Sequence, residues 1–114
     1  MENKGLRIVQ SENTVDVLYG EQLLVSADKS LDVHTEFQAD VPEIGYVEVI
    51  VYGGISPVVV VGVNPNSDEG FPIECEHGDG TFRLMVACAT QSGYTPVAEV
   101  DIIRDQTVDF KVIS

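Results

Sequence analysis

Four side chains in the second half of the chain are of types that bind transition metals. Cys75, His77, Asp79 and Cys88 supply thiols, an imidazole and a carboxylate, the groups that usually hold zinc. Structural zinc sites normally draw on closely spaced C-x-x-C pairs, and the sequence has none. We therefore expect two free thiols buried in the core and a turn residue at His77. His34, without a thiol or acidic partner at ligand spacing, is also expected to be structural.

Oxygen-bearing side chains alternate along the segment that begins at Asn64. Asn64, Asn66 and Asp68 have the alternate spacing of ligands in a calcium loop. However, Glu69 stands where an EF-hand needs glycine, and Cys75 stands where it needs a bidentate glutamate. The same composition is typical of turns. A turn is therefore expected, and a metal site at Asn64, Asn66 and Asp68 is the weaker alternative.

Two carboxylates, Glu74 and Glu76, lie two residues apart, the spacing that places both on one face of a strand. A general acid and a general base must flank a substrate, whereas neighbours on a strand face project in parallel. The pair is therefore expected to belong to a solvated face, with acid–base catalysis as the alternative. The sequence also has no Gly-x-Ser-x-Gly elbow and no glycine-rich phosphate loop. We expect a protein that is not an enzyme and has no cofactor.

The composition predicts one acidic, folded domain over residues 1–114. The chain has 19 Asp and Glu against 6 Lys and Arg, a net charge of −13, yet 44% of its residues are hydrophobic. That hydrophobic fraction is too high for a disordered chain, and the length is typical of one domain. The negative charge opposes binding to nucleic acid and to anionic membranes, and no apolar run reaches the ~20 residues of a membrane span. The apolar patch at residues 6–9 is too short for a signal peptide, so assembly in a reducing cytoplasm is expected.

The hydrophobic pattern has a period of two residues almost throughout, which predicts an all-β chain. In the most regular segment, residues 81–88, Phe82, Leu84 and Val86 share one face. Turn residues separate the apolar segments at intervals of about 8–12 residues, which is typical of sandwiches. We expect an antiparallel β-sandwich, immunoglobulin-like or jelly-roll-like, of about 8–10 short strands. The expected strands are 6–9, 14–18, 23–26, 31–37, 46–52, 58–63, 71–76, 81–88, 98–102 and 108–112.

A first β-hairpin is predicted from residues 71–76 and 81–88. The glycines between them suit a turn, and Cys75 would then face Phe82. In this register Cys88 would lie about 20 Å along the strand from Cys75. That distance exceeds the range of a disulfide.

A second hairpin is predicted at the C-terminal end of the chain. Its apolar faces align if Val100 faces Phe110, which places Asp101 opposite Asp109. Like charges directly opposite each other are unfavourable. The conflict indicates either a different register or a site for a cation.

The segment 46–63 is apolar on both faces of its two expected strands. Tyr46, Ile50 and Tyr52 share one face, and alternating valines share the other. Antiparallel sheets usually show one face to water, so a ribbon without a polar face needs a second cover. We expect another subunit to provide that cover. The residues expected at this interface are Val47, Val49, Val51, Tyr52, Val59 and Val61.

Short motifs along the chain resemble a known class of protein. Residues 5–9 read Gly-Leu-Arg-Ile-Val and residues 14–18 read Thr-Val-Asp-Val-Leu, Pro57 precedes three valines, and residues 107–113 read Thr-Val-Asp-Phe-Lys-Val-Ile. Over roughly the whole length this pattern resembles small tail-associated structural proteins of tailed bacteriophages. The resemblance implies a non-catalytic virion protein of the tail, tail tip or head decoration, assembled in the host cytoplasm. Its partners would be other virion proteins and copies of itself.

A carbohydrate-binding or adhesive module is the alternative from another functional class. Tyrosine rings can stack on sugars, and acidic residues of the segment after Asn64 could hold calcium. The residues expected in that role are Tyr19, Tyr46, Tyr52 and Tyr94, with Asp68 or Glu69 at the cation.

Overall fold

The computed structural model describes residues 5–41, 44–65, 71–78, 80–90 and 93–110, and these ranges form ten β-strands. The predicted all-β sandwich is confirmed. No helix in these ranges is long and apolar enough to cross a membrane. The strands are β1 (Leu6–Gln10), β2 (Thr14–Tyr19), β3 (Gln22–Asp28), β4 (His34–Val41), β5 (Gly45–Tyr52), β6 (Val58–Pro65), β7 (Phe71–Glu76), β8 (Phe82–Thr90), β9 (Gly93–Ile102) and β10 (Gln106–Phe110).

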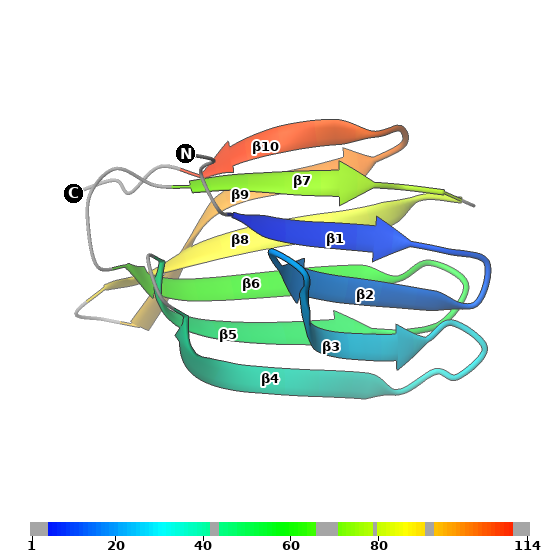
Figure 1. Ribbon diagram of the computed structural model, residues 1–114, viewed down its shortest axis with the longest axis horizontal. Helices are drawn as coiled ribbons and strands as arrows, with labels where there is room; N and C mark the ends of the chain where they lie inside the picture. Colours follow the sequence, from blue (N-terminus) through cyan, green and yellow to red (C-terminus); the bar gives the residue numbers. More distant parts are fainter. Residues whose placement is uncertain (1–4, 42–43, 66–70, 79, 91–92, 111–114) are drawn as a thin grey trace.

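The strands form two five-stranded sheets that stack as layers (Figure 1). Sheet A has the order β10-β7-β1-β2-β3, and sheet B has the order β4-β5-β6-β8-β9. Most neighbours are antiparallel, but β1 pairs with β7 and β6 pairs with β8 in parallel. Each sheet is therefore mixed rather than wholly antiparallel. Parallel neighbours cannot be joined by a tight hairpin, and the chain accordingly crosses between the layers.

The core lies between the inner faces of the two sheets, as alternation along each strand dictates. Along β5, for example, Val47, Val49 and Val51 are fully buried between more exposed residues. Sheet A contributes buried aliphatic side chains such as Leu6 and Ile8 to the same core. Each fully buried aliphatic side chain contributes roughly 1.5–3 kcal/mol to folding. This interior holds the sheets together and leaves their outer faces and loops for other roles.

The hairpin predicted from residues 71–76 and 81–88 is wrong. Strand β7 lies in sheet A, paired with β1 and β10, and β8 lies in sheet B, paired with β6 and β9. The connection between them crosses from one layer to the other, and Gln10 Nε2 anchors it by donating a hydrogen bond to His77 O at 2.9 Å. A glycine-containing turn permits both a hairpin and a crossing, so the local pattern does not select the partner strand.

The predicted C-terminal hairpin is also wrong, for the same reason. Strand β9 pairs with β8 in sheet B, and β10 pairs with β7 in sheet A, so Val100 faces Leu84. Asp101 does not face another carboxylate. It lies opposite Arg83, whose Nε donates a hydrogen bond to Asp101 Oδ1 at 2.9 Å. The expected charge conflict is removed by an arginine of the neighbouring strand.

Candidate contact surfaces

Five of the six residues expected at a subunit interface lie inside the protein, which corrects that expectation. They are Val47, Val49, Val51, Val59 and Val61, each 0% exposed in the core between the sheets. A side chain with no exposed surface cannot contact another chain while the sandwich stays intact. The sixth, Tyr52, is 45% exposed on the outer face of sheet B. The second cover that the valines require is sheet A of the same chain.

The outer face of sheet B carries the other apolar side of the same ribbon. Ile50 and Val60 lie opposite each other there and are half-buried, and Tyr46 and Tyr52 are exposed. The ring of Tyr52 lies 5.6 Å from that of His34, measured between centroids, at a tilt of 43°. Three of the four tyrosines singled out from the sequence, Tyr46, Tyr52 and Tyr94, are exposed in sheet B. Tyr19 instead lies in sheet A, packed against the core.

The two glutamates with the spacing for acid–base chemistry lie on the outer face of sheet A. Glu74 is exposed, and Glu76 accepts a hydrogen bond from Arg7 Nε at 3.0 Å and a second from the Arg7 terminal nitrogen. The pairing with Glu76 raises the pKa of the Arg7 guanidinium. The structure thus gives Glu76 a guanidinium partner across the β1–β7 pair.

The residues of zinc-binding type belong to different parts of the sandwich. Cys75 lies in sheet A and Cys88 in sheet B; both are buried and free, as predicted. His77 lies in the β7–β8 connection, where its backbone N–H donates to Asp105 Oδ1 at 3.0 Å. This bond, followed by the contact with the His77 ring, lowers the pKa of Asp105. Asp79 lies outside the described residues.

The calcium alternative falls mostly on residues that the structure does not describe. Asn66, Asp68 and Glu69 lie outside the described ranges, and Asn64 is an exposed residue near the end of β6. Within the described ranges, no three His, Cys, Asp or Glu side chains gather in a way that could hold a metal ion.

The burial of Cys75 leads to a prediction about thiol reactivity. Desolvation raises the pKa of the Cys75 thiol from 9.0 to about 12. Because the thiolate is the reactive form, we expect iodoacetamide at pH 8 to leave Cys75 unmodified in the folded protein and to alkylate it in urea. Peptide mass spectrometry measures the alkylation, and rapid modification without denaturant would contradict the burial.

The same raised pKa makes the stability of the protein depend on pH. Below pH 9 the Cys75 thiol is neutral in both the folded and the unfolded chain, so its contribution to stability is complete. As the pH rises from 9 toward 12, the thiol ionises in the unfolded chain but not in the folded one, and the free energy of unfolding falls.

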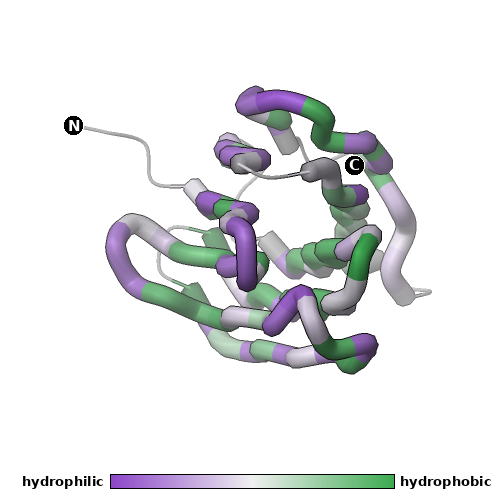
Figure 2. Tube along the Cα trace, turned by 90° about the vertical axis from the view of Figure 1, so that its right-hand side faces the viewer, coloured by the Kyte–Doolittle hydropathy of each residue, from purple (hydrophilic) through white to green (hydrophobic). Residues whose placement is uncertain are grey.

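One end of the sandwich collects connections and exposed aliphatic side chains. The connections β1–β2, β3–β4, β5–β6, β7–β8 and β9–β10 all lie there, and Figure 2 looks onto them, with apolar stretches among polar ones. We call Leu31, Val33, Ile55 and Ile103 the apolar end. Their exposed fractions are 51%, 54%, 99% and 62%. Leu31, Val33 and Ile55 lie in two connections that contact each other, whereas Ile103 follows β9 at the opposite edge of the sandwich. Large aliphatic side chains that are exposed close together are typical of a contact surface.

Backbone contacts hold the apolar end in place. Gly53 N–H donates to Val33 O at 2.9 Å, which joins the β5–β6 connection to the segment before β4. A Cβ at Gly53 would come within 2.5 Å of Asp28 O and 2.6 Å of Leu31 O, so the two connections pack backbone to backbone. The close approach keeps the aliphatic residues of both connections on one surface.

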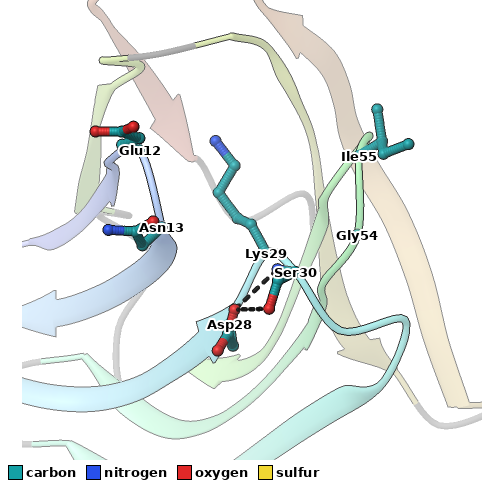
Figure 3. Close-up of a pocket in the computed structure, with 7 residues that line it drawn as sticks. All are labelled: Glu12, Asn13, Asp28, Lys29, Ser30, Gly54 and Ile55. Carbon is teal, nitrogen blue, oxygen red and sulfur yellow. Dashed lines mark hydrogen bonds between the residues drawn. The ribbon is translucent and has the colours of Figure 1, made fainter.

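A depression of about 400 Å³ lies beside Ile55 (Figure 3). Its walls include Glu12, Asn13, Asp28 and the cation Lys29. Asp28 Oδ1 accepts hydrogen bonds from the Ser30 N–H and hydroxyl at 2.8 and 2.7 Å. These two bonds lower the pKa of Asp28. The Ile55 side chain projects away from the Glu12 and Asp28 carboxylates, so the aliphatic group and the polar wall occupy different sides of the depression.

Sequence reasoning missed the apolar end because it assigned Leu31 and Val33 to a strand over residues 31–37. Strand β4 begins at His34, so both residues fall in the connection before it. Ile55 stands between glycine and Ser-Pro in a turn, where aliphatic side chains are unusual. That placement was the available signal.

Compared with known proteins, the chain matches no protein-family model, no curated protein and no solved structure.

Proposed function

We propose that this protein is a non-catalytic structural component of a tailed-phage virion, in the tail, the tail tip or a head decoration, and that it acts through protein contacts at the apolar end. The observation that carries the proposal is the nearly complete exposure of Ile55, at 99%, next to the connection that carries the exposed Leu31 and Val33. A side chain of this kind gains free energy when a partner removes it from water. The motifs at residues 5–9, 14–18 and 107–113 are the reason for placing that partner in a virion.

The charge of the chain indicates what kind of surface receives the apolar end. The net charge is −13, and the depression beside Ile55 is lined by two carboxylates, Glu12 and Asp28, against one cation, Lys29. A second copy meeting this end would bring the same charges into opposition, whereas a basic surface would attract them. We therefore assign to this end a different virion protein that offers an apolar hollow bordered by Lys or Arg. Copies of this chain would then take their positions in the particle by binding that partner protein.

The test compares two aspartate substitutions during infection by the phage that encodes the chain. Ile55→Asp should reduce incorporation into purified particles at least about tenfold, since buried aliphatic anchors are worth about 1–2 kcal/mol or more at interfaces. Because Ile55 is 99% exposed, the free energy of unfolding should change by less than about 0.5 kcal/mol. Quantitative mass spectrometry of the particles and urea denaturation of the purified chain measure the two effects.

Leu23→Asp is the matched control for this test. Leu23 is 54% exposed at the start of β3, at the opposite end of the sandwich, and the substitution adds the same charge. Its incorporation should equal that of the wild type. Equal incorporation of Ile55→Asp and Leu23→Asp would exclude the apolar end as the contact, and absence of the wild-type chain from particles would exclude the virion role.

A further inference from the structure

On the outer face of sheet B, a tyrosine ring packs on a glycine of a neighbouring part of the sheet, separate from the apolar end. In the register of the sheet, Gly62 of β6 lies between Glu48 of β5 and Ala87 of β8, and Ala87 lies opposite Pro96 of β9. Gly62 has no side chain and Ala87 has only a methyl group, so little projects from the outer face of the sheet at these two positions. Tyr94, at the start of β9, reaches across β8 and packs over Gly62.

The ring of Tyr94 lies over the Gly62 backbone with one face against it. A Cβ built on Gly62 would be 2.9 Å from the ring Cε1, 3.2 Å from Cζ and 3.3 Å from Cδ1. Three nearly equal distances to bonded ring atoms indicate an approach to the face of the ring, because an approach in the ring plane would leave the two outer atoms much farther away. Tyr94 is still 46% exposed. Its free face is therefore turned to solvent on a support that limits its motion.

A chain of polar side chains borders this ring. Tyr46 hydroxyl donates to Gln38 Oε1 at 3.2 Å, and Gln38 Nε2 donates to Glu48 Oε2 at 2.6 Å. These bonds use one of the two Gln38 N–H groups and one of the two Glu48 oxygens, so both side chains retain hydrogen-bonding capacity toward a ligand. Burial, then Glu48 and then Tyr46, raise the pKa of the Tyr94 hydroxyl, which therefore stays a donor at neutral pH.

We propose that Tyr94, together with Tyr46, Gln38 and Glu48, binds a pyranose unit of a neutral oligosaccharide. A pyranose has a flat C–H face that packs on an aromatic ring and hydroxyls at its edge that match a carboxylate and an amide. Glu48 itself and the net charge of −13 disfavour anionic sugars. The inference goes beyond the assembly role, and it uses residues of the sheet face instead of those at the apolar end.

The proposal is tested by titrating the ¹⁵N-labelled full chain with cellohexaose, maltohexaose, mannohexaose, xylohexaose and chitohexaose. At least one of them should shift the amide resonances of residues 46–48, 62 and 94 in a saturable way. Tyr94→Ala should weaken that binding at least about tenfold, and Tyr94→Phe, which keeps the stacking face, should weaken it much less. If none of these sugars shifts those resonances, or if an anionic oligogalacturonate binds as well as the best of them, the proposal is wrong.

Two further variants test whether sugar binding depends on the packing of Tyr94 on Gly62 or on any exposed tyrosine of this face. Gly62→Ala introduces a Cβ that must displace the Tyr94 ring, so it should weaken sugar binding while every polar group remains. Tyr52→Ala removes a tyrosine of similar exposure, 45%, from the other half of the same face and should leave binding unchanged. Equal losses in Gly62→Ala and Tyr52→Ala would contradict the assignment. Ile55→Asp should not change the titration, so failure of the sugar site and failure of the virion role are distinguishable.

Discussion

Replacing Val49 with aspartate should unfold the protein. Val49 is 0% exposed on the inner face of β5, opposite Val61 of β6, which is also 0% exposed. A carboxylate there would lose its hydration without gaining a partner, at a cost of about 4 kcal/mol or more. The free energy of unfolding of a single domain is only about 5–15 kcal/mol, so this cost is comparable with the entire stability of the protein. Far-ultraviolet circular dichroism and urea denaturation should show a chain that is largely unfolded or melts at much lower denaturant.

Tyr52→Asp is the matched control for this substitution. Tyr52 lies on the same strand but points outward and is 45% exposed, so its replacement should cost about 1 kcal/mol or less. The comparison also separates a core from a subunit interface, because an interface valine would affect assembly while leaving the isolated chain folded. A Val49→Asp chain with an unchanged denaturation midpoint would contradict the position of Val49 in the core.

Gly53→Ala should destabilise the fold strongly, although it adds only one methyl group, and should disturb the apolar end. The new Cβ would lie 2.5 Å from Asp28 O and 2.6 Å from Leu31 O, and both are backbone atoms that cannot rotate away. The β3–β4 connection would have to shift, which also strains the hydrogen bond from Gly53 N–H to Val33 O. We expect a loss of about 3 kcal/mol in the free energy of unfolding. Urea denaturation measures it.

Gly20→Ala provides the comparison for this effect. Gly20 has a positive φ of 61°, but a Cβ there would meet nothing within 4 Å. Its replacement should therefore cost only the backbone strain of a left-handed residue, about 1–2 kcal/mol. If Gly53→Ala cost no more than Gly20→Ala, the close packing of the two connections would be wrong. Incorporation of Gly53→Ala into particles should also fall, since the segment that carries Leu31 and Val33 moves.

Strand positions could be predicted from the sequence because alternation is a local property. The pattern of residues 81–88 predicts a strand with Phe82, Leu84 and Val86 on one face, and all three are buried in β8. The segments 58–63 and 71–76 also lie in strands of the structure. Strand pairing could not be predicted in this way. A turn between two strands is compatible with a hairpin or with a crossing, and both of the predicted hairpins proved to be crossings.

The contact residues illustrate a related difficulty. Where a ribbon is apolar on both faces, as at residues 46–63, alternation separates two sets of side chains but does not say which set is inside. Val47, Val49, Val51, Val59 and Val61 face sheet A, whereas Tyr46 and Tyr52 lie on the outer face with Val60. The grouping of Tyr94 with Glu48 depends on three strand pairings in sheet B, and nothing in their sequence spacing indicates it.

The sequence by itself determined that this chain is an acidic β-sandwich with two buried thiols, because composition and period-two alternation act within single segments. The tertiary structure decided which strands are neighbours, which side of the ribbon is covered, and which aliphatic residues remain in water at one end. The physical reason is that strand pairing and burial depend on the free energy of the whole two-layer arrangement, to which all ten strands contribute. The residues of one short segment therefore do not determine its partners.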